Sequence, residues 1–200
     1  MDTIHTEERN GLTINIAQDL EPQSPREWDN LGHMICFHSR YTLGDKHNFS
    51  TDEFNGWEEM EIDLKTQYEA VVVLPLYLYD HSGISMRTYR HGHHASWDCG
   101  CVGFIYVTKG DIIKEYDKVT KKTIARAEKV LIGEVEEYNY YLTGNVYGYI
   151  IEDKDGKNLE SCWGFSGDYE KGALKEAQSL VDHMTNNGKT DHTGQLLMKI

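Results

Sequence analysis

The chain has 200 residues, with 20 Lys and Arg against 33 Asp and Glu, so its formal net charge is −13. This balance argues against loose binding of nucleic-acid phosphates, which needs clustered cations, and it favours high solubility or a basic partner. The amino end has no basic start followed by an apolar stretch, and no apolar run reaches the roughly 18 residues of a membrane helix. We therefore expect one cytoplasmic domain, without membrane contact and with reduced cysteines.

The first third of the chain is predicted to hold two strands and a helix. Apolar and polar residues alternate over 12–16, which is typical of a half-buried strand. A loop rich in turn-forming residues follows, and the segment 33–41 has the composition of a second strand. The segment 51–69 has a partial apolar stripe at helical spacing, and Ser50 or Thr51 would cap that helix.

The middle of the chain contains the clearest strand and the clearest helix. The apolar run 70–80 predicts a buried strand, and Pro75, which has no N–H, predicts a sheet edge or a bulge there. A further strand is expected over 101–109, and Thr108 would cap a short helix that ends near residue 117. Over 120–142, apolar residues recur at spacings of three and four, which predicts one long amphipathic helix.

The last part of the chain is predicted to form a hairpin and a helix. Two strands within 145–167 flank the pair Asp155-Gly156, which favours a tight primed turn. A final helix is expected over 168–184. These elements predict an α+β fold, in which a mainly antiparallel sheet packs against one long helix and one or two shorter helices. We expect a single domain over 1–185 and a weakly ordered tail over 186–200.

The segment that follows the strand 70–80 is rich in residues that bind metals. Imidazole and thiolate groups together suit zinc, although their spacing here fits none of the standard zinc patterns. The alternative interpretation is a polar loop with surface histidines and small buried cysteines. The candidate ligands are Asp80, His81, His91, His93, Cys99 and Cys101.

Two other catalytic arrangements are weakly indicated. Asp80, His81 and Ser82 are adjacent in sequence, but members of a catalytic triad meet across a fold, and no G-x-S-x-G elbow is present. Acidic residues cluster within 52–61 and again within 134–137, where carboxylates could bind a divalent ion. Charge runs on amphipathic helices are usually solvated faces, which we favour here.

Aromatic residues near turns suggest a surface that recognises another protein. Each of the four tryptophans lies beside an acidic residue or a glycine, in or near a predicted turn, and aromatic side chains often anchor interfaces. The alternative is that the indoles fill the core of a small domain. The four are Trp28, Trp57, Trp97 and Trp163.

Several strings of the sequence resemble a family of small proteins carried by phages and other mobile elements. The resemblance covers most of residues 25–167 and rests on PREWDNLG, YLYDHSG, WDCGCVGFIYV and YLTGNVYGY. It implies a context rather than a reaction, because acidic accessory proteins of phages often block host defence complexes, as anti-CRISPR and DNA-mimic anti-restriction proteins do. Nucleic-acid-handling enzymes present basic grooves, which an acidic surface complements.

The leading hypothesis is therefore a non-enzymatic protein without a cofactor. It would bind and inhibit a host enzyme that targets nucleic acid, in the manner of an anti-CRISPR or anti-restriction protein. Its partner would be a host protein with a basic nucleic-acid-binding groove, and no direct contact with nucleic acid is expected. The residues predicted to form the binding surface are Trp28, Asp29, Asp80, His81, Trp97 and Asp98.

Two alternative functions remain open. The first is a zinc-dependent hydrolase or nuclease that uses the His- and Cys-rich segment 80–101. The second is a protein that sequesters a nucleotide signal, which needs a concave pocket with several Arg or Lys. The segment around residues 80–90 offers only Arg87 and Arg90 for that purpose.

Overall fold

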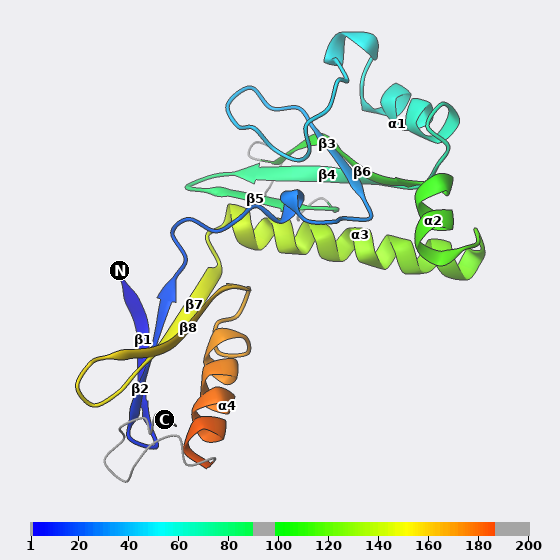
Figure 1. Ribbon diagram of the computed structural model, residues 1–200. Coiled ribbons are helices and arrows are strands. Elements are labelled where there is room, and N and C mark those ends of the chain that lie inside the picture. The colour runs from blue at the N-terminus through cyan, green and yellow to red at the C-terminus, as the bar shows by residue number, and fades with distance from the viewer. Residues whose placement is uncertain (1, 90–98, 187–200) are drawn as a thin grey trace. The chain divides into compact units, whose positions relative to one another are not determined.

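A computed structural model describes residues 2–89 and 99–186 of the chain (Figure 1). These residues form four α-helices and eight strands, and the strands make two four-stranded antiparallel sheets. The predicted α+β class and antiparallel pairing are confirmed, but the strands are divided between two sheets where the sequence predicts one. No helix in this part of the chain is both long and apolar enough to cross a lipid bilayer.

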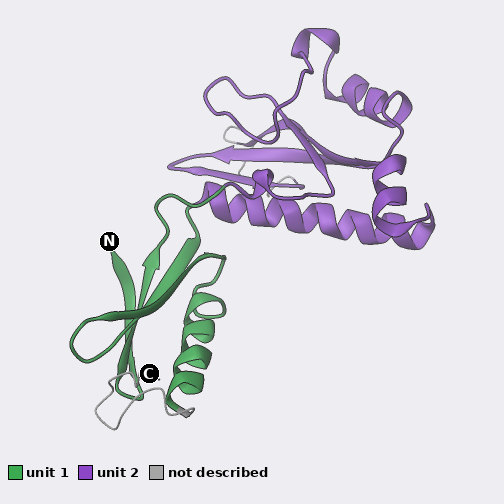
Figure 2. Cartoon of the chain, in the orientation of Figure 1, with its two compact units in different colours: residues 1–23, 144–200 green, residues 24–143 purple. Residues whose placement is uncertain are grey.

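The chain divides into two compact units (Figure 2). We call residues 2–23 with 144–186 the terminal unit, and residues 24–89 with 99–143 the inserted unit, because the second interrupts the first in sequence. The segment 1–185, for which we expect a single domain, thus contains two units. Each unit has its own sheet and its own hydrophobic core.

The terminal unit has one sheet and one helix. Its sheet has the order β1-β2-β7-β8, so strands from the two ends of the chain pair at its centre, with Ile14 opposite Ile151. Helix α4 packs on the face formed by Leu12, Ile14 and Ile16. The elements are β1 (Thr3–Arg9), β2 (Leu12–Gln18), β7 (Val146–Glu152), β8 (Asn158–Ser166) and α4 (Ala173–Asn186).

Both hairpins of the terminal unit differ from the sequence prediction. Strand β1 was not predicted, and Asn10 and Gly11, with φ of 53° and 80°, form the turn that joins it to β2. The hairpin β7–β8 is confirmed, but its tight turn is not the primed turn predicted at Asp155-Gly156. The Gly156 N–H donates to the Asp153 carbonyl at 3.0 Å and closes a β-turn over residues 153–156. The buried Asp153 carboxylate supports this turn by accepting hydrogen bonds from the N–H groups of Asp155 and Lys157.

The inserted unit has a sheet with a helix on each face. The strand order is β3-β6-β4-β5, and neighbouring residues of β6 alternate between two hydrophobic clusters. Ile105 packs on the side of α3, whereas Phe104 packs on the side of α1. The elements are β3 (His33–Cys36), α1 (Trp57–Thr66), β4 (Ala70–Asp80), β5 (Ile84–Arg87), β6 (Cys99–Thr108), α2 (Lys109–Tyr116) and α3 (Lys121–Leu142).

The predicted edge at Pro75 is confirmed. Pro75 lies opposite Phe104 of β6, whereas β5 pairs with β4 from Tyr77 to Asp80, so among the described strands Pro75 is paired on one side only. The register with β6 also shifts between Leu76 and Tyr77. A proline, which has no N–H to donate, is tolerated at an edge of this kind.

Two other predictions for the inserted unit are only partly confirmed. The predicted helix 51–69 is a short 3-10 helix, η2 (Thr51–Glu53), followed by α1, with three residues, Phe54, Asn55 and Gly56, between them. The predicted strand 33–41 ends at Cys36. The long helix is confirmed almost to the residue, because Thr120 caps its first turn and Gly144, with φ of 70°, follows its end.

Candidate functional site

The residues predicted to bind a partner do not form one site. Asp29 lines a pocket between α2 and α3, whereas Asp80 lines a second pocket at the end of β4, and the two linings share no residue. Trp28 is 49% exposed beside Asp29, and His81 is exposed in the turn after β4. The remaining predicted residues, Trp97 and Asp98, lie outside the described part of the chain.

The pocket at the end of β4 has a volume of about 580 Å³. Asp80 lies in it, but its carboxylate is held by an ion pair with Arg40 and accepts a hydrogen bond from the Tyr41 hydroxyl at 3.4 Å. Cys99 and Cys101 also line this pocket. The structure therefore brings together three of the six candidate zinc ligands.

These three residues do not form a metal centre in the described structure. Within residues 2–89 and 99–186, no group of three or more His, Cys, Asp or Glu side chains is arranged to hold a metal ion. His91 and His93 fall outside those ranges, so the zinc hypothesis stays a prediction. All four cysteines are free, and burial raises the pKa of the Cys36 thiol to about 12, which keeps it protonated at neutral pH.

A buried ion network fixes the loop that carries Trp28 and Asp29. The Arg26 guanidinium, 5% exposed, donates two hydrogen bonds to the Asp45 carboxylate, at 2.8 and 2.9 Å, and one to Glu134 at 3.0 Å. Glu134 also accepts from the N–H groups of Leu31 and Gly32. The expectation that the acidic residues 134–137 form a solvated face of the helix is therefore wrong for Glu134, whose side chain is only 11% exposed.

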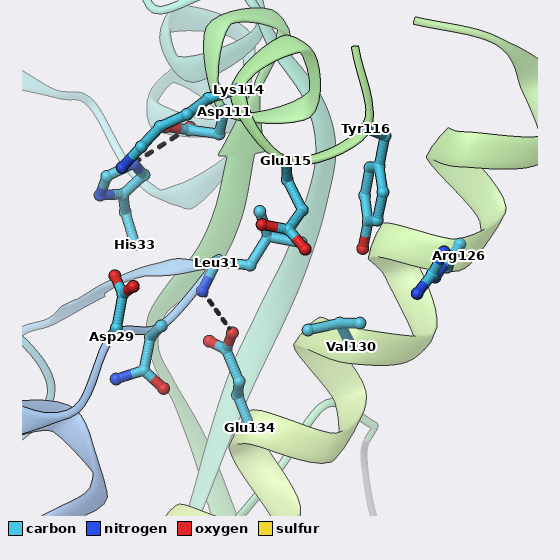
Figure 3. Close-up of a pocket in the computed structure, with 11 residues that line it drawn as sticks. Asp29, Leu31, His33, Asp111, Lys114, Glu115, Tyr116, Arg126, Val130 and Glu134 are labelled. Atoms are coloured by element: carbon cyan, nitrogen blue, oxygen red, sulfur yellow. Dashed lines mark hydrogen bonds and ion pairs between the residues drawn. The ribbon is translucent and has the colours of Figure 1, made fainter. Parts of the chain in front are cut away.

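The pocket between α2 and α3 has a volume of about 420 Å³ (Figure 3). Two of its acidic side chains are already engaged: Glu134 in the Arg26 network, and Asp111 with His33 at 3.1 Å. Asp29 and Glu115 also line the pocket, and their carboxylates have no partner among the described residues. Lys114 and Arg126 bring positive charge to the same lining.

Asp111 stays ionised because the chain surrounds its carboxylate with donors. Burial tends to raise the pKa of Asp111, but hydrogen bonds from the Thr108 hydroxyl and N–H and the charge of His33 outweigh this and lower the pKa below its usual value. The bond from the Thr108 N–H is also one half of the capping box of α2, and the Asp111 N–H, which donates to the Thr108 hydroxyl, makes the other half. Asp111 therefore has a structural role at this pocket.

A third feature is an acidic surface on the opposite face of the sheet. We call residues 50–69, which form η2 and α1, the acidic lobe. They contain seven acidic residues and one cation, Lys65, and so carry a formal charge of −6. The seven acidic residues are Asp52, Glu53, Glu58, Glu59, Glu61, Asp63 and Glu69.

Many acidic side chains of the lobe are engaged within the lobe or at its edge. Glu53 closes the capping box of η2, and Glu59 accepts hydrogen bonds from Asn55. Glu61 pairs with Lys65, and Glu69 pairs with Lys109. Asp52 and Glu58, by contrast, are exposed, and their carboxylates have no partner in the described chain. These two are the carboxylates most available to another molecule.

Apolar side chains lie exposed among these carboxylates. Ile62 is 55% exposed on the outer side of α1, one turn beyond Glu58. Trp57 packs one edge against Phe104 yet remains partly exposed, and Tyr68 does the same against Phe49. Exposed aromatic and aliphatic groups within a charged rim are typical of protein-binding surfaces.

Comparison of the chain with protein-family models, with curated proteins and with solved structures found no match. A function for this chain must therefore be inferred from its fold and from the chemistry of its surfaces.

The sequence prediction did not identify the acidic lobe as a binding surface, and it missed the cations beside the pocket and the Arg26 network. The acidic lobe was visible as a cluster of carboxylates, and counting charge over a window of twenty residues would have separated it from the rest of the chain. The same count would have found six cations within residues 114–129, beside the pocket between α2 and α3. The Arg26 network left no such signal, because its partners are 19 and 108 residues away.

Proposed function

We propose that this protein binds a protein partner through the acidic lobe, and that the partner surface is a basic groove that otherwise binds nucleic acid. The observation that carries the proposal is the concentration of charge: one tenth of the chain holds −6 of a total of −13. A dense acidic surface attracts a basic groove at long range and competes there with a phosphate backbone.

The apolar side chains of the lobe support a protein partner. Charge alone gives orientation and a fast association rate, whereas buried aromatic and aliphatic groups supply most of the affinity of an interface. Ile62 and Trp57 are placed among the carboxylates, so a docked partner would bury them. This combination favours a groove with both basic and apolar residues.

Occupying such a groove would inhibit the partner. The resemblance to small proteins of phages and mobile elements favours a host enzyme that targets foreign nucleic acid, such as a CRISPR effector or a restriction enzyme. In this proposal the protein performs no reaction of its own. The lobe replaces the residues first predicted for the binding surface, of which Trp28, Asp29, Asp80 and His81 lie elsewhere in the inserted unit.

The proposal is tested by reversing the two available carboxylates. The variant D52K/E58K changes the charge of the lobe by four while keeping its capping box and its ion pairs. The matched control D155K/E170K makes the same change at two exposed positions of the terminal unit. Each protein is immobilised and exposed to nuclease-treated bacterial lysate over a series of salt concentrations, and bound proteins are identified by mass spectrometry.

We expect the unchanged protein and the control to retain the same nucleic-acid-binding protein, with retention that falls as salt rises, and D52K/E58K to lose it. The purified partner should then lose its nucleic-acid binding when the unchanged protein is added. Equal retention by all three proteins, or a retained partner that has no affinity for nucleic acid, contradicts the proposal.

A further inference from the structure

A basic surface lies on the side of the inserted unit that faces away from the acidic lobe. We call its six cations the basic face. Only three acidic residues are interspersed with them over residues 114–129, which gives +3 within a strongly acidic chain. All six side chains are exposed, and none forms an ion pair with a carboxylate of the described residues. They are Lys114, Lys118, Lys121, Lys122, Arg126 and Lys129.

The acidic lobe does not cancel the charge of the basic face. Helices α1 and α3 pack on opposite faces of one sheet, as the alternation of Phe104 and Ile105 between their clusters shows. Two packed layers at about 10 Å each separate the two helices by roughly 20 Å. At physiological ionic strength the Debye length is about 8 Å, so each surface interacts with its surroundings largely on its own.

Three of the cations form a stripe along α3. Lys122, Arg126 and Lys129 are four and three residues apart, so they lie on one side of the helix. At 1.5 Å per residue the stripe is about 10 Å long. In a duplex the phosphates of one strand follow each other at about 3.4 Å along the axis, which sets an upper limit of about three phosphates on the stripe. An extended single strand, whose phosphates are farther apart, places fewer of them there.

The pocket between α2 and α3 opens beside this stripe. Arg126 belongs to both the stripe and the pocket lining, and it stacks on the Tyr116 ring with 4.9 Å between its Cζ atom and the ring centre (Figure 3). The lining also offers the carboxylates of Asp29 and Glu115, which can only accept hydrogen bonds when ionised. A ligand that fits both places has anionic groups for the stripe and hydrogen-bond donors for the pocket.

A nucleotide has this combination, because its phosphate is anionic and its base carries an amino group in cytosine, adenine and guanine. We propose that the basic face and this pocket bind single-stranded nucleic acid, with phosphates along the stripe and one unstacked base in the pocket. A single strand fits because a base within a duplex cannot enter a pocket without leaving its stack.

A single strand of nucleic acid fits this surface better than a free mononucleotide does. Only Lys114 and Arg126 line the pocket, and the other four cations lie beyond it, where a mononucleotide would not reach them. The net charge of −13 predicts no direct binding of nucleic acid, but that prediction treats the charge as evenly spread. The proposal rests on the separation of charge between two faces, and it does not depend on a partner for the acidic lobe.

The test measures binding of fluorescein-labelled oligo-dC, oligo-dT and cytidine monophosphate to the full chain by fluorescence anisotropy, at several salt concentrations. The variant K122E/K129E removes two cations of the stripe and leaves the contact of Arg126 with Tyr116. The control K154E/K157E makes the same charge change at exposed lysines of the β7–β8 loop. Circular dichroism verifies that both variants fold.

We expect oligo-dC to bind, and K122E/K129E to weaken it while lowering the slope of log K against log salt by about 1 for each lysine. The control should bind as the unchanged protein does, and cytidine monophosphate should bind much more weakly than the strand. Oligo-dC should bind more tightly than oligo-dT, because thymine presents a carbonyl oxygen to the carboxylates. In D29N/E115Q the preference for oligo-dC over oligo-dT should shrink, because side-chain amides can also donate a hydrogen bond to the carbonyl oxygen of thymine.

Three outcomes overturn the proposal. One is the absence of oligonucleotide binding at low salt, and another is an equal loss in K122E/K129E and in its control. The third is a sedimentation coefficient that shows self-association of the unchanged protein and is lost in K122E/K129E, which would assign the basic face to a second copy of the chain.

Discussion

The two compact units cover their sheets differently. In the inserted unit, α1 and α3 lie on opposite faces of the sheet, whereas in the terminal unit α4 packs on one face, and residues 2–23 and 144–186 place no helix on the other. Each unit also contains an arginine that binds a carboxylate far along the chain. Arg26 of the inserted unit is 5% exposed, whereas Arg9 of the terminal unit, which binds Asp182, is 35% exposed.

This difference teaches that similar chemistry has different consequences in the two units. Where a charge network is withdrawn from water, as around Arg26, it must be complete, because an unpaired buried charge is strongly unfavourable. Where the pair stays partly exposed, as Arg9 and Asp182 do, water and ions screen it, and losing Arg9 leaves no buried charge behind. The inserted unit should therefore be sensitive to polar substitutions, and the terminal unit to changes in packing.

The largest expected effect is that of Arg26→Met. The substitution leaves Asp45 and Glu134 without their cation, and we expect the unfolding free energy of the inserted unit to fall by about 3–5 kcal/mol. Urea titration monitored by hydrogen exchange of β6 peptides measures this unit separately. A loss below about 1 kcal/mol would show that water replaces the guanidinium, and would remove the contrast between the units.

An intermediate effect is expected for Gly148→Ala in the terminal unit. A Cβ atom on Gly148 would lie 2.2 Å from Cε3 of Trp163 and 2.8 Å from the Cys162 carbonyl oxygen. Overpacking of this kind destabilises by about 1–3 kcal/mol, and the indole can move because it is partly exposed on an edge strand. Hydrogen exchange of β7 peptides measures the loss. Adding Trp163→Ala should recover part of it, and no recovery would contradict the assigned contact.

The smallest effect is expected for Arg9→Met, and it should depend on pH. The hydrogen bond from Arg9 lowers the pKa of Asp182. A lowered folded-state pKa gives stability that is present above the unfolded value of about 3.9 and is lost as pH falls through the folded value. Thermal unfolding from pH 7 into the acid range should therefore show a small difference between R9M and the unchanged protein that disappears at low pH. A difference that persists there would contradict an electrostatic origin.

Elements that follow from local pattern were predictable from the sequence. The helix over 120–142 has an uninterrupted apolar stripe and a capping threonine, and the strand over 70–80 is a continuous apolar run. The pair Asn10-Gly11 is a strong local signal for a hairpin, but the polar character of residues 3–9 hides the strand β1 that precedes it.

Features that depend on distant residues were not predictable in this way. The division of the strands into two sheets rests on β2 pairing with β7, more than 120 residues later. The candidate surfaces were predictable only in part: the charges are visible in the sequence, but their separation onto two faces depends on which side of one sheet α1 and α3 occupy. The apolar stripe of a helix shows which side of the helix is buried, but it does not show which face of the sheet the helix covers.

The insertion of one unit within the other has a consequence for biosynthesis. The β1–β2 hairpin leaves the ribosome before the inserted unit, but its apolar residues Leu12, Ile14 and Ile16 cannot be covered until β7 and α4 have been made. The inserted unit is continuous in sequence and can fold while translation proceeds. Its folding brings the two ends of the inserted unit, Ser24 and Thr143, into one compact body. This shortens the effective loop between β2 and β7 and so lowers the entropy cost of pairing them. Folding of the inserted unit thus favours folding of the terminal unit.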